Sequence, residues 1–205
     1  MSDRWKSDEL TEDEKDDKSA KVYSSGKKRM IFLYGDINEK NCADIAFDIH
    51  CQNIEDDESE SHEKDFVRKP IRLYINSFGG EVYPMWMLIS AIENSKTPVY
   101  TYCTGYAMSA AFQIFLAGQK RYISKHATLM YHQIHCWRSG KYQDLVDDRE
   151  HMDFLNSQIE EFVLEKTTLS HEEINTIREM KRDAYFSSKD AVEKGMAELL
   201  EENGT

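Results

Sequence analysis

Short apolar runs that alternate with helical stretches constrain this chain more than any other feature of its sequence. In the first part of the chain, runs with strand character and stretches with helical periodicity take turns: 30–34, 38–52, 71–75, 82–94, 99–103 and 108–116. Parallel strands need crossover connections, which are usually helices, so this alternation favours a mostly parallel sheet covered by helices. The sequence therefore predicts an α/β fold.

The second part of the chain continues the pattern with shorter strands and one long helix. Its predicted elements are strands at 121–123 and 128–131, a helix at 142–166, a helix from Ser170 to about 181, a strand at 185–186 and a helical turn at 190–194. Ser170 is a typical N-cap residue, and Glu173 completes a capping box with it. Neither an internal repeat nor a boundary between two folded units is visible, so we expect one domain over 29–205.

Two charged segments stand apart from this pattern. Residues 1–28 contain few large apolar side chains, and such a composition cannot offset the entropy cost of ordering the chain, so we predict a mobile N-terminal tail. Residues 55–65, EDDESESHEKD, form an acidic run. We interpret this run as an acidic insertion in a solvated loop, and a partner-facing insertion is the alternative.

Charge and hydropathy exclude several classes of function. The 26 Lys and Arg residues against 38 Asp and Glu give a net charge of −12, so we expect neither nucleic-acid binding nor docking on an anionic membrane. No apolar run is long enough to span a membrane, and the N-terminal residues lack the apolar core of a signal peptide. Four scattered cysteines read as free thiols: Cys42, Cys51, Cys103 and Cys136. A cytoplasmic location without membrane insertion is therefore expected.

Two junctions between a strand and a helix are candidate functional sites. Gly79 and Gly80 end an apolar strand, where backbone N–H groups can converge on an anion, although an ordinary tight turn is the simpler reading. Ser109 begins a helix of small residues, where the helix dipole would favour an activated hydroxyl, although an N-cap serine is again the simpler reading.

Such a site also needs a base, and histidine is the residue type considered for this role. His132 ends the strand at 128–131 and is the candidate base, while His135 close by raises the alternative of a metal site. No third ligand follows at a fixed spacing, and the Gly-Gly pair matches neither a P-loop nor GxGxxG. We therefore predict no metal and no cofactor.

Four segments in register resemble motifs of one family over about 29–200. INSFGGEV at 75–82 resembles INSPGGxV, GYAMSAA at 105–111 resembles GxAASMG, MYHQ at 130–133 resembles MIHQ, and 182–195 resembles the end motif RDxFxSAxEAxxYGLID. The family is ClpP, the proteolytic subunit of the Clp proteases. The resemblance implies a crotonase-like α/β spiral with parallel sheets and covering helices, in which the helix at 142–166 is the long handle helix.

The resemblance also implies a serine peptidase that works inside homo-oligomeric heptameric rings, stacked in pairs as tetradecamers. Carried over residue by residue, Ser109 is the nucleophile and His132 the general base. The backbone N–H groups of Gly80 and Ala110 are the oxyanion donors. The residues that would flank the peptide groove are Phe78, Gly79, Val82, Gln133 and Ile134.

The third member of the triad is less well defined. The family has an Asp four residues before the Asp of its Arg-Asp pair, and counting back from Asp183 reaches Glu179. A glutamate performs this task in some α/β hydrolases, so Glu179 is our prediction. An ordinary exposed position for Glu179 is the alternative, and Asp183 is the second candidate for the acid.

Several departures from the family motifs bear on substrates and partners. Phe78 and Ile134 stand where the family has proline beside the groove. Arg72 and Asn94 stand where the family has the aromatic residues that dock its ATPase, whereas the docking residue Tyr74 is kept. We therefore expect cleavage of short or unfolded peptides without a standard Clp ATPase, as in the translocation-enhancing or phage-associated branches. The alternatives are an inactive assembly or regulatory subunit, and a crotonase-like enzyme acting on an acyl-CoA.

Overall fold

The computed structural model describes residues 21–25, 28–180 and 182–201. Within these residues, eight strands form one sheet. The strands are β1 (Lys21–Ser25), β2 (Met30–Ile37), β3 (Ile71–Gly80), β4 (Val99–Met108), β5 (Lys120–Ile123), β6 (Thr128–Tyr131), β7 (Ala184–Ser187) and β8 (Glu198–Leu199). Their order is β1-β2-β3-β4-β5-β8, and β6 pairs with both β4 and β7. All pairs are parallel except β1 with β2 and β6 with β7.

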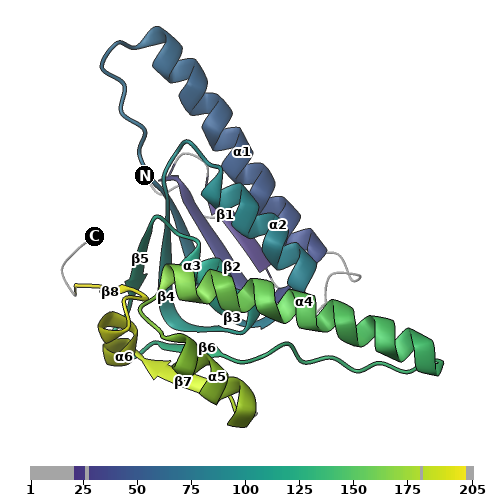
Figure 1. Ribbon diagram of the computed structural model, residues 1–205. Helices are drawn as coiled ribbons and strands as arrows, with labels where there is room; N and C mark the ends of the chain where they lie inside the picture. The colour runs from purple at the N-terminus through teal and green to yellow at the C-terminus, as the bar shows by residue number, and fades with distance from the viewer. Residues whose placement is uncertain (1–20, 26–27, 181, 202–205) are drawn as a thin grey trace, which may run out of the picture.

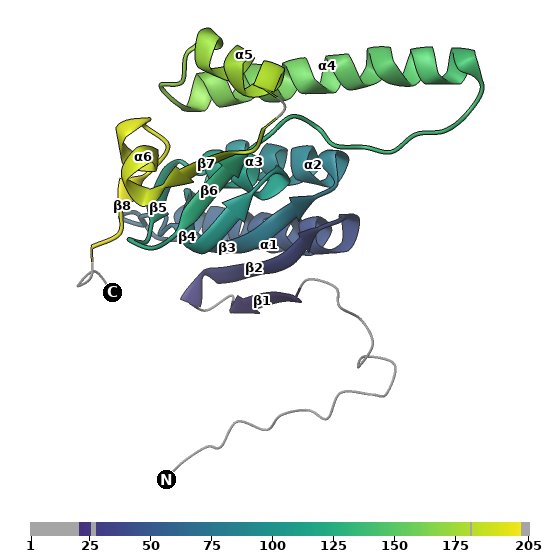
Figure 2. The ribbon, with the colours of Figure 1, turned by 90° about the horizontal axis from the view of Figure 1, so that it is seen from below.

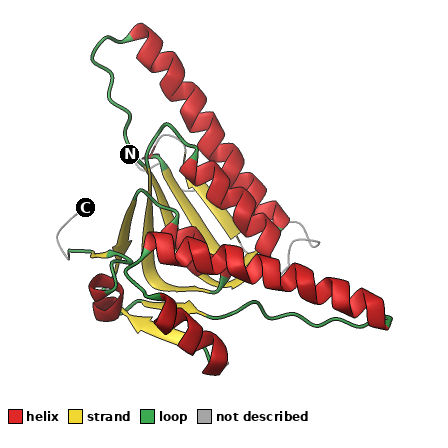
Figure 3. Cartoon of the chain, viewed as in Figure 1, coloured by secondary structure: helices red, strands yellow, loops and turns green. Residues whose placement is uncertain are grey.

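Helices cover this sheet, as Figure 1 and Figure 3 show. They are α1 (Glu39–His62), α2 (Val82–Glu93), α3 (Ala110–Leu116), α4 (Tyr142–Lys166), α5 (His171–Met180) and α6 (Ser188–Glu193). Helices α1 and α2 lie side by side against the sheet, and α4 projects beyond it (Figure 1). Figure 2 shows α4 and α5 on the side of the molecule opposite β1. The expected α/β fold and the long handle helix at 142–166 are confirmed.

Alternation along the central strands separates the core from an aromatic face. Ile71, Leu73 and Ile75 of β3 are fully buried in the core formed with the helices. The intervening side chains point to the other face, where four rings stack across β2, β3, β4 and β5 with centroid distances of 4.7, 4.8 and 5.0 Å: Phe32, Tyr74, Tyr102 and Tyr122. The parallel register places these four residues opposite one another, which explains the ladder.

The acidic run is helical, and the predicted solvated loop is wrong for 55–62. Helix α1 continues to His62, because one side chain of the run is buried and paired. Asp56 is 1% exposed, forms an ion pair with Arg29 and accepts a hydrogen bond from Thr97 Oγ1 at 2.5 Å. Asp57 and Glu60 both contact Arg68. The run therefore ties α1 to the start of β2 instead of forming a loop.

Other predicted element boundaries also differ from those in the structure. The N-terminal tail was predicted through residue 28, but Lys21–Ser25 form β1, and residues 1–20 lie outside the described part of the chain. Strand β4 runs through Gly105, beyond the strand predicted at 99–103. Gly105 is needed for close packing, since a Cβ there would lie 2.3 Å from Oδ1 of Asn76, which accepts a hydrogen bond from the Tyr106 N–H.

Local signals near the C-terminal half were reliable. The Ser170–Glu173 capping box forms as predicted, with the Ser170 N–H donating to the Glu173 carboxylate at 2.8 Å and the Glu173 N–H to Ser170 Oγ at 3.2 Å. The four cysteines are free thiols. In the described residues, no helix combines the length and apolar character that crossing a membrane requires. Strand β8 is the one element of this region that the sequence pattern did not predict.

Candidate active site

The junction between β4 and α3 holds Ser109 in a strained conformation. Its φ of 52° is in the left-handed region, which a residue other than glycine rarely adopts. The Ser109 N–H donates to the Met130 carbonyl of β6 at 2.9 Å, and its own carbonyl accepts from the Phe112 N–H of α3. These bonds hold the backbone in the strained turn, so the side chain is presented at the end of the sheet.

His132 follows directly after β6 and faces this serine. Its Nε2 lies 2.8 Å from Oγ of Ser109, a hydrogen-bond distance. Because β6 pairs with β4 in parallel, the two strands deliver both residues to the same edge of the sheet. The structure therefore brings together the predicted nucleophile and the predicted base.

The carboxylate beside His132 belongs to Asp183, not to Glu179. Oδ1 of Asp183 lies 3.8 Å from Nδ1 of His132. In the antiparallel pair of β6 and β7, Tyr131 lies opposite Ala184, so the next residues outward, His132 and Asp183, are neighbours. Glu179 sits on α5, before the chain turns into β7, and is exposed. Counting along the family motif led to Glu179, whereas the strand register places Asp183, the second candidate, beside His132.

Burial controls the charge of the imidazole. Partial burial lowers the pKa of His132 below its ordinary value; the charge of Asp183 raises the pKa and His135 lowers it. His132 is therefore neutral at neutral pH, with Nε2 free to accept the hydroxyl proton of Ser109 when Nδ1 carries the proton toward Asp183.

Gly79 and Gly80 pack the end of β3 against the serine. Gly79 has a φ of 106°, and a Cβ there would lie 2.7 Å from Cβ of Ser109 and 3.1 Å from the Ala110 nitrogen. A Cβ on Gly80 would lie 2.2 Å from the carbonyl oxygen of Ile37. Gly79 is therefore required where β3 packs against Ser109, and Gly80 where β3 packs against the end of β2.

A small cleft of about 90 Å³ opens beside these residues. It is lined by Gly80, Val82, Met85, Ser109, Ala110, Gln113, His132, Ile134, His135 and Ile159. Val82 and Ile134 are therefore in the predicted place. Phe78 instead packs against Tyr106, with ring centroids 4.3 Å apart and the ring planes tilted by 32°, and is 65% exposed. Gln133 is exposed outside the cleft.

Several lining and supporting residues were missed in the sequence. Gln113 lies four residues after Ser109 on α3, a helical spacing that places both on one face, so this residue could have been found. Ile159 comes from the distant handle helix, which no local signal links to the serine. Asn156 of the same helix accepts a hydrogen bond from the Ile134 N–H at 2.9 Å and anchors the segment after His132.

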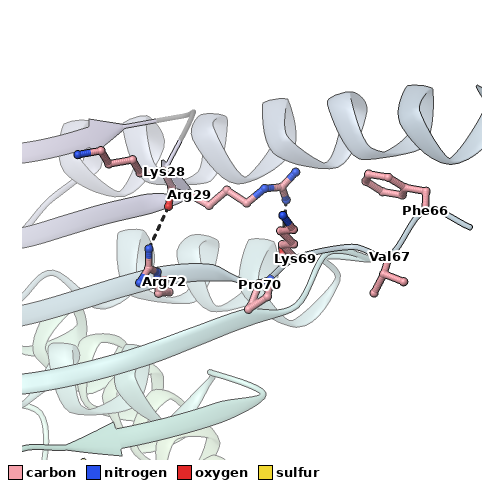
Figure 4. Close-up of a pocket in the computed structure, with 7 residues that line it drawn as sticks. All are labelled: Lys28, Arg29, Phe66, Val67, Lys69, Pro70 and Arg72. Carbon is pink, nitrogen blue, oxygen red and sulfur yellow. Dashed lines mark hydrogen bonds between the residues drawn. The ribbon is translucent and has the colours of Figure 1, made fainter. Parts of the chain in front are cut away.

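A second hollow of about 510 Å³ lies at the start of β2 and β3, away from the serine (Figure 4). Its lining is mainly basic and apolar: Lys28, Arg29, Phe66, Val67, Lys69, Pro70 and Arg72. Arg29 donates to the Lys69 carbonyl at 3.0 Å and Arg72 to the Lys28 carbonyl at 3.3 Å. This hollow offers no nucleophile or base, so its larger volume does not make it the catalytic centre.

The smaller cleft has the parts needed for acyl transfer. The Ser109 hydroxyl lies beside the His132 imidazole, which lies beside the Asp183 carboxylate, and Gly79 lets the end of β3 pack closely against Ser109. Among the residues that the structure describes, no group of three or more His, Cys, Asp or Glu side chains is arranged to hold a metal ion. His135 is one of the residues that line the cleft.

Comparison with known proteins agrees with this class of site. The family model described as Clp protease matches residues 14–203, so the chain belongs to the Clp protease family. It is 27% identical over 176 residues to ATP-dependent Clp protease proteolytic subunit 1 of Prochlorococcus marinus strain MIT 9312, covering 85% of this chain and 84% of that protein. It is 31% identical over 132 residues to proteolytic subunit 4 of Rhodococcus jostii strain RHA1, covering 63% of this chain and 67% of that protein.

A third relative gives a similar picture. The chain is 30% identical over 177 residues to proteolytic subunit 1 of Prochlorococcus marinus subsp. pastoris, covering 85% of this chain and 84% of that protein. The ClpP fold and the resemblance to ClpP peptidases are thereby confirmed.

Proposed function

We propose that the protein is a serine endopeptidase that cleaves short or unfolded peptides. The observation that carries this proposal is the 2.8 Å separation of Ser109 Oγ and His132 Nε2 at the edge of the sheet. Membership of the Clp protease family supports hydrolysis of peptides over acyl-CoA chemistry. The third member of the triad in this proposal is Asp183, in place of Glu179.

The geometry translates into an ordinary acyl-transfer sequence. His132 takes the hydroxyl proton as Ser109 Oγ attacks the carbonyl carbon, and the N–H groups of Gly80 and Ala110 stabilise the oxyanion. His132 then gives that proton to the leaving amine, which completes the acyl-enzyme. A water molecule, deprotonated by His132, attacks the acyl-enzyme, and the proton returns to Ser109 as the carboxylate product leaves. Asp183 keeps the imidazole in the required tautomer.

Labelling and sedimentation of one purified sample test this proposal. A fluorophosphonate probe is expected to modify Ser109 in the same species that sediments as a ring. Failure to label a correctly assembled ring would favour the alternative of an inactive assembly subunit. Labelling at another serine would overturn the assignment of the nucleophile.

We also propose that the chain assembles into homo-oligomeric heptameric rings that stack in pairs. Large apolar side chains stand exposed on the handle helix: Tyr142 at 82%, Leu145 at 40% and Phe154 at 56%. Exposed apolar side chains on one projecting helix favour contact with a second copy. Replacing Phe154 with Glu should separate stacked rings, and analytical ultracentrifugation would then show half the mass. The four free thiols fit a reducing cytoplasmic location.

Finally, we propose that this ring does not use a standard Clp ATPase. Arg72 lines the basic hollow of Figure 4, and Asn94 caps α2 with its amide bonded to the Ser90 carbonyl at 2.8 Å, so both replacements present polar groups. The aromatic ladder that includes Tyr74 remains on the neighbouring face. A pull-down with a Clp unfoldase is expected to recover little of this protein. If the double variant Arg72→Tyr with Asn94→Phe binds the unfoldase, the loss of the two aromatic docking residues is the reason for the weak binding. Ordinary affinity of the unchanged protein would overturn this part.

A further inference from the structure

Gln113 is an unusual residue for the bottom of an apolar cleft. It lies on α3, four residues after Ser109, and is 2% exposed. It lines the cleft together with the proposed catalytic pair. Within the described residues, its Oε1 atom is buried and accepts no hydrogen bond.

A buried carbonyl without a partner is costly, because folding has removed its water without replacing the lost hydrogen bond. Of the side chains that line the cleft, Val82, Met85, Ile134 and Ile159 carry no donor. Ser109 and His132 bond to each other, and among the described residues His135 makes no hydrogen bond to the Gln113 carbonyl. A ligand side chain that enters the cleft is therefore the natural partner for this amide.

We propose that the cleft receives the substrate side chain just before the scissile bond, called P1 below, and that Gln113 selects a primary amide there. The inference rests on the proposed peptidase function. The Gln113 amide offers one acceptor and two donors. A P1 glutamine or asparagine complements both kinds of group at once.

Other side chains fit the cleft less well. A leucine or methionine would leave the carbonyl of Gln113 unpaired, and a carboxylate has no donor to offer it. A lysine or arginine would bring a charge into a cleft of about 90 Å³ whose lining holds no carboxylate. Gln113 is thus a specificity-determining residue, and the preferred substrates are peptides with glutamine or asparagine at P1.

Two peptides that differ only at P1 provide the test, because glutamine and methionine have similar length and shape. We expect the unchanged protein to favour P1 glutamine over P1 methionine by about tenfold in kcat/KM, the ratio worth about 1.4 kcal/mol. Gln113→Met, which keeps the volume of the side chain, should reverse this preference. In a second variant, Gln113→Glu, kcat/KM should be higher for P1 glutamine than for P1 glutamate.

A binding measurement separates this inference from the proposed function. Fluorescence anisotropy with the same two peptides and the Ser109→Ala protein reports the P1 preference without any hydrolysis. If the unchanged protein reacts with a fluorophosphonate but both peptides bind and react equally well, the inference is wrong and the proposed function stands. If labelling fails while the preference for glutamine in binding persists and depends on Gln113, the proposed function is wrong, and only the selection of a primary amide by the cleft stands.

Discussion

Nε2 of His132 lies 2.8 Å from Oγ of Ser109, although 23 residues separate the two in the chain. The contact arises because β4 and β6 are parallel neighbours that end at the same edge of the sheet. Ser109 is held there in a strained turn. This backbone conformation costs about 1–3 kcal/mol, which the surrounding hydrogen bonds must offset.

Replacing Ser109 with Ala should abolish the reaction with a fluorophosphonate and lower kcat/KM by at least about 10³-fold. The variant loses the hydroxyl but keeps a Cβ of the same size, so circular dichroism and ring assembly should be unchanged. Ser157→Ala on the exposed face of α4 is the matched control and should label normally. Persistent labelling of Ser109→Ala would show that another residue is the nucleophile.

Asp183→Asn should lower kcat by about 10²–10⁴-fold, because the amide cannot stabilise the imidazolium or enforce the correct tautomer. Glu179→Gln makes the same chemical change, from a carboxylate to an amide, near the end of α5. It should change kcat by no more than about twofold. Steady-state kinetics on the two variants decide between the acids. A large loss in Glu179→Gln with full activity in Asp183→Asn would restore the assignment made from the motif.

The pH profile should report the environment of His132. Burial lowers the pKa of the imidazole below its ordinary value of about 6.5, so the base is neutral and active above that lower pKa. We therefore expect the acid limb of kcat/KM below pH 6.5, with activity lost as the pH falls through the pKa. The charge of Asp183 raises this pKa, so in Asp183→Asn the acid limb should move to still lower pH. A limb that moves upward would contradict the sign of the coupling.

Gly79→Ala should lower kcat/KM by at least about tenfold, because the new Cβ meets the Ser109 Cβ and the backbone at a φ that disfavours side chains. The loss of stability measured by thermal unfolding should be smaller than the loss of activity, since the crowding is confined to the place where β3 packs against Ser109. Gly140→Ala is the control, because there a Cβ would meet only the flexible side chain of Asp144 at 3.3 Å. Equal activity in the two variants would argue against a close approach of Gly79 to the serine.

Asp56→Asn should lower the free energy of unfolding by about 2–3 kcal/mol, because it leaves the Arg29 guanidinium without its buried counter-ion. The pKa of Asp56 is lowered; desolvation opposes the lowering, and hydrogen bonds from Arg29 and Thr97 outweigh it. Its stabilisation is therefore complete above the unfolded pKa of about 3.9 and is lost as the pH falls. Urea unfolding at pH 7 measures the effect, with exposed Glu58→Gln as a control expected to unfold at an unchanged midpoint.

Local patterns were sufficient wherever a segment's neighbours in the chain determine its structure. The handle helix has the predicted bounds, and the Ser170–Glu173 box forms because its partners are three residues apart. The acidic run was misjudged for the opposite reason. Its charge suggested solvent, but the ion pair of Asp56 with Arg29 joins residues 27 positions apart, and such distant contacts stabilise the continued helix.

The sequence by itself determined the α/β class and the order of most elements, and it singled out Ser109 and His132 as the candidate pair, since apolar periodicity and short motifs are local properties. The tertiary structure decided which acid faces the imidazole, because the antiparallel register of β6 and β7 sets Asp183 beside His132 and leaves Glu179 on α5. It also decided that the amide of Gln113 lies buried without a partner in the cleft. Both facts depend on which segments pack together across the sheet, and no spacing within one segment encodes them.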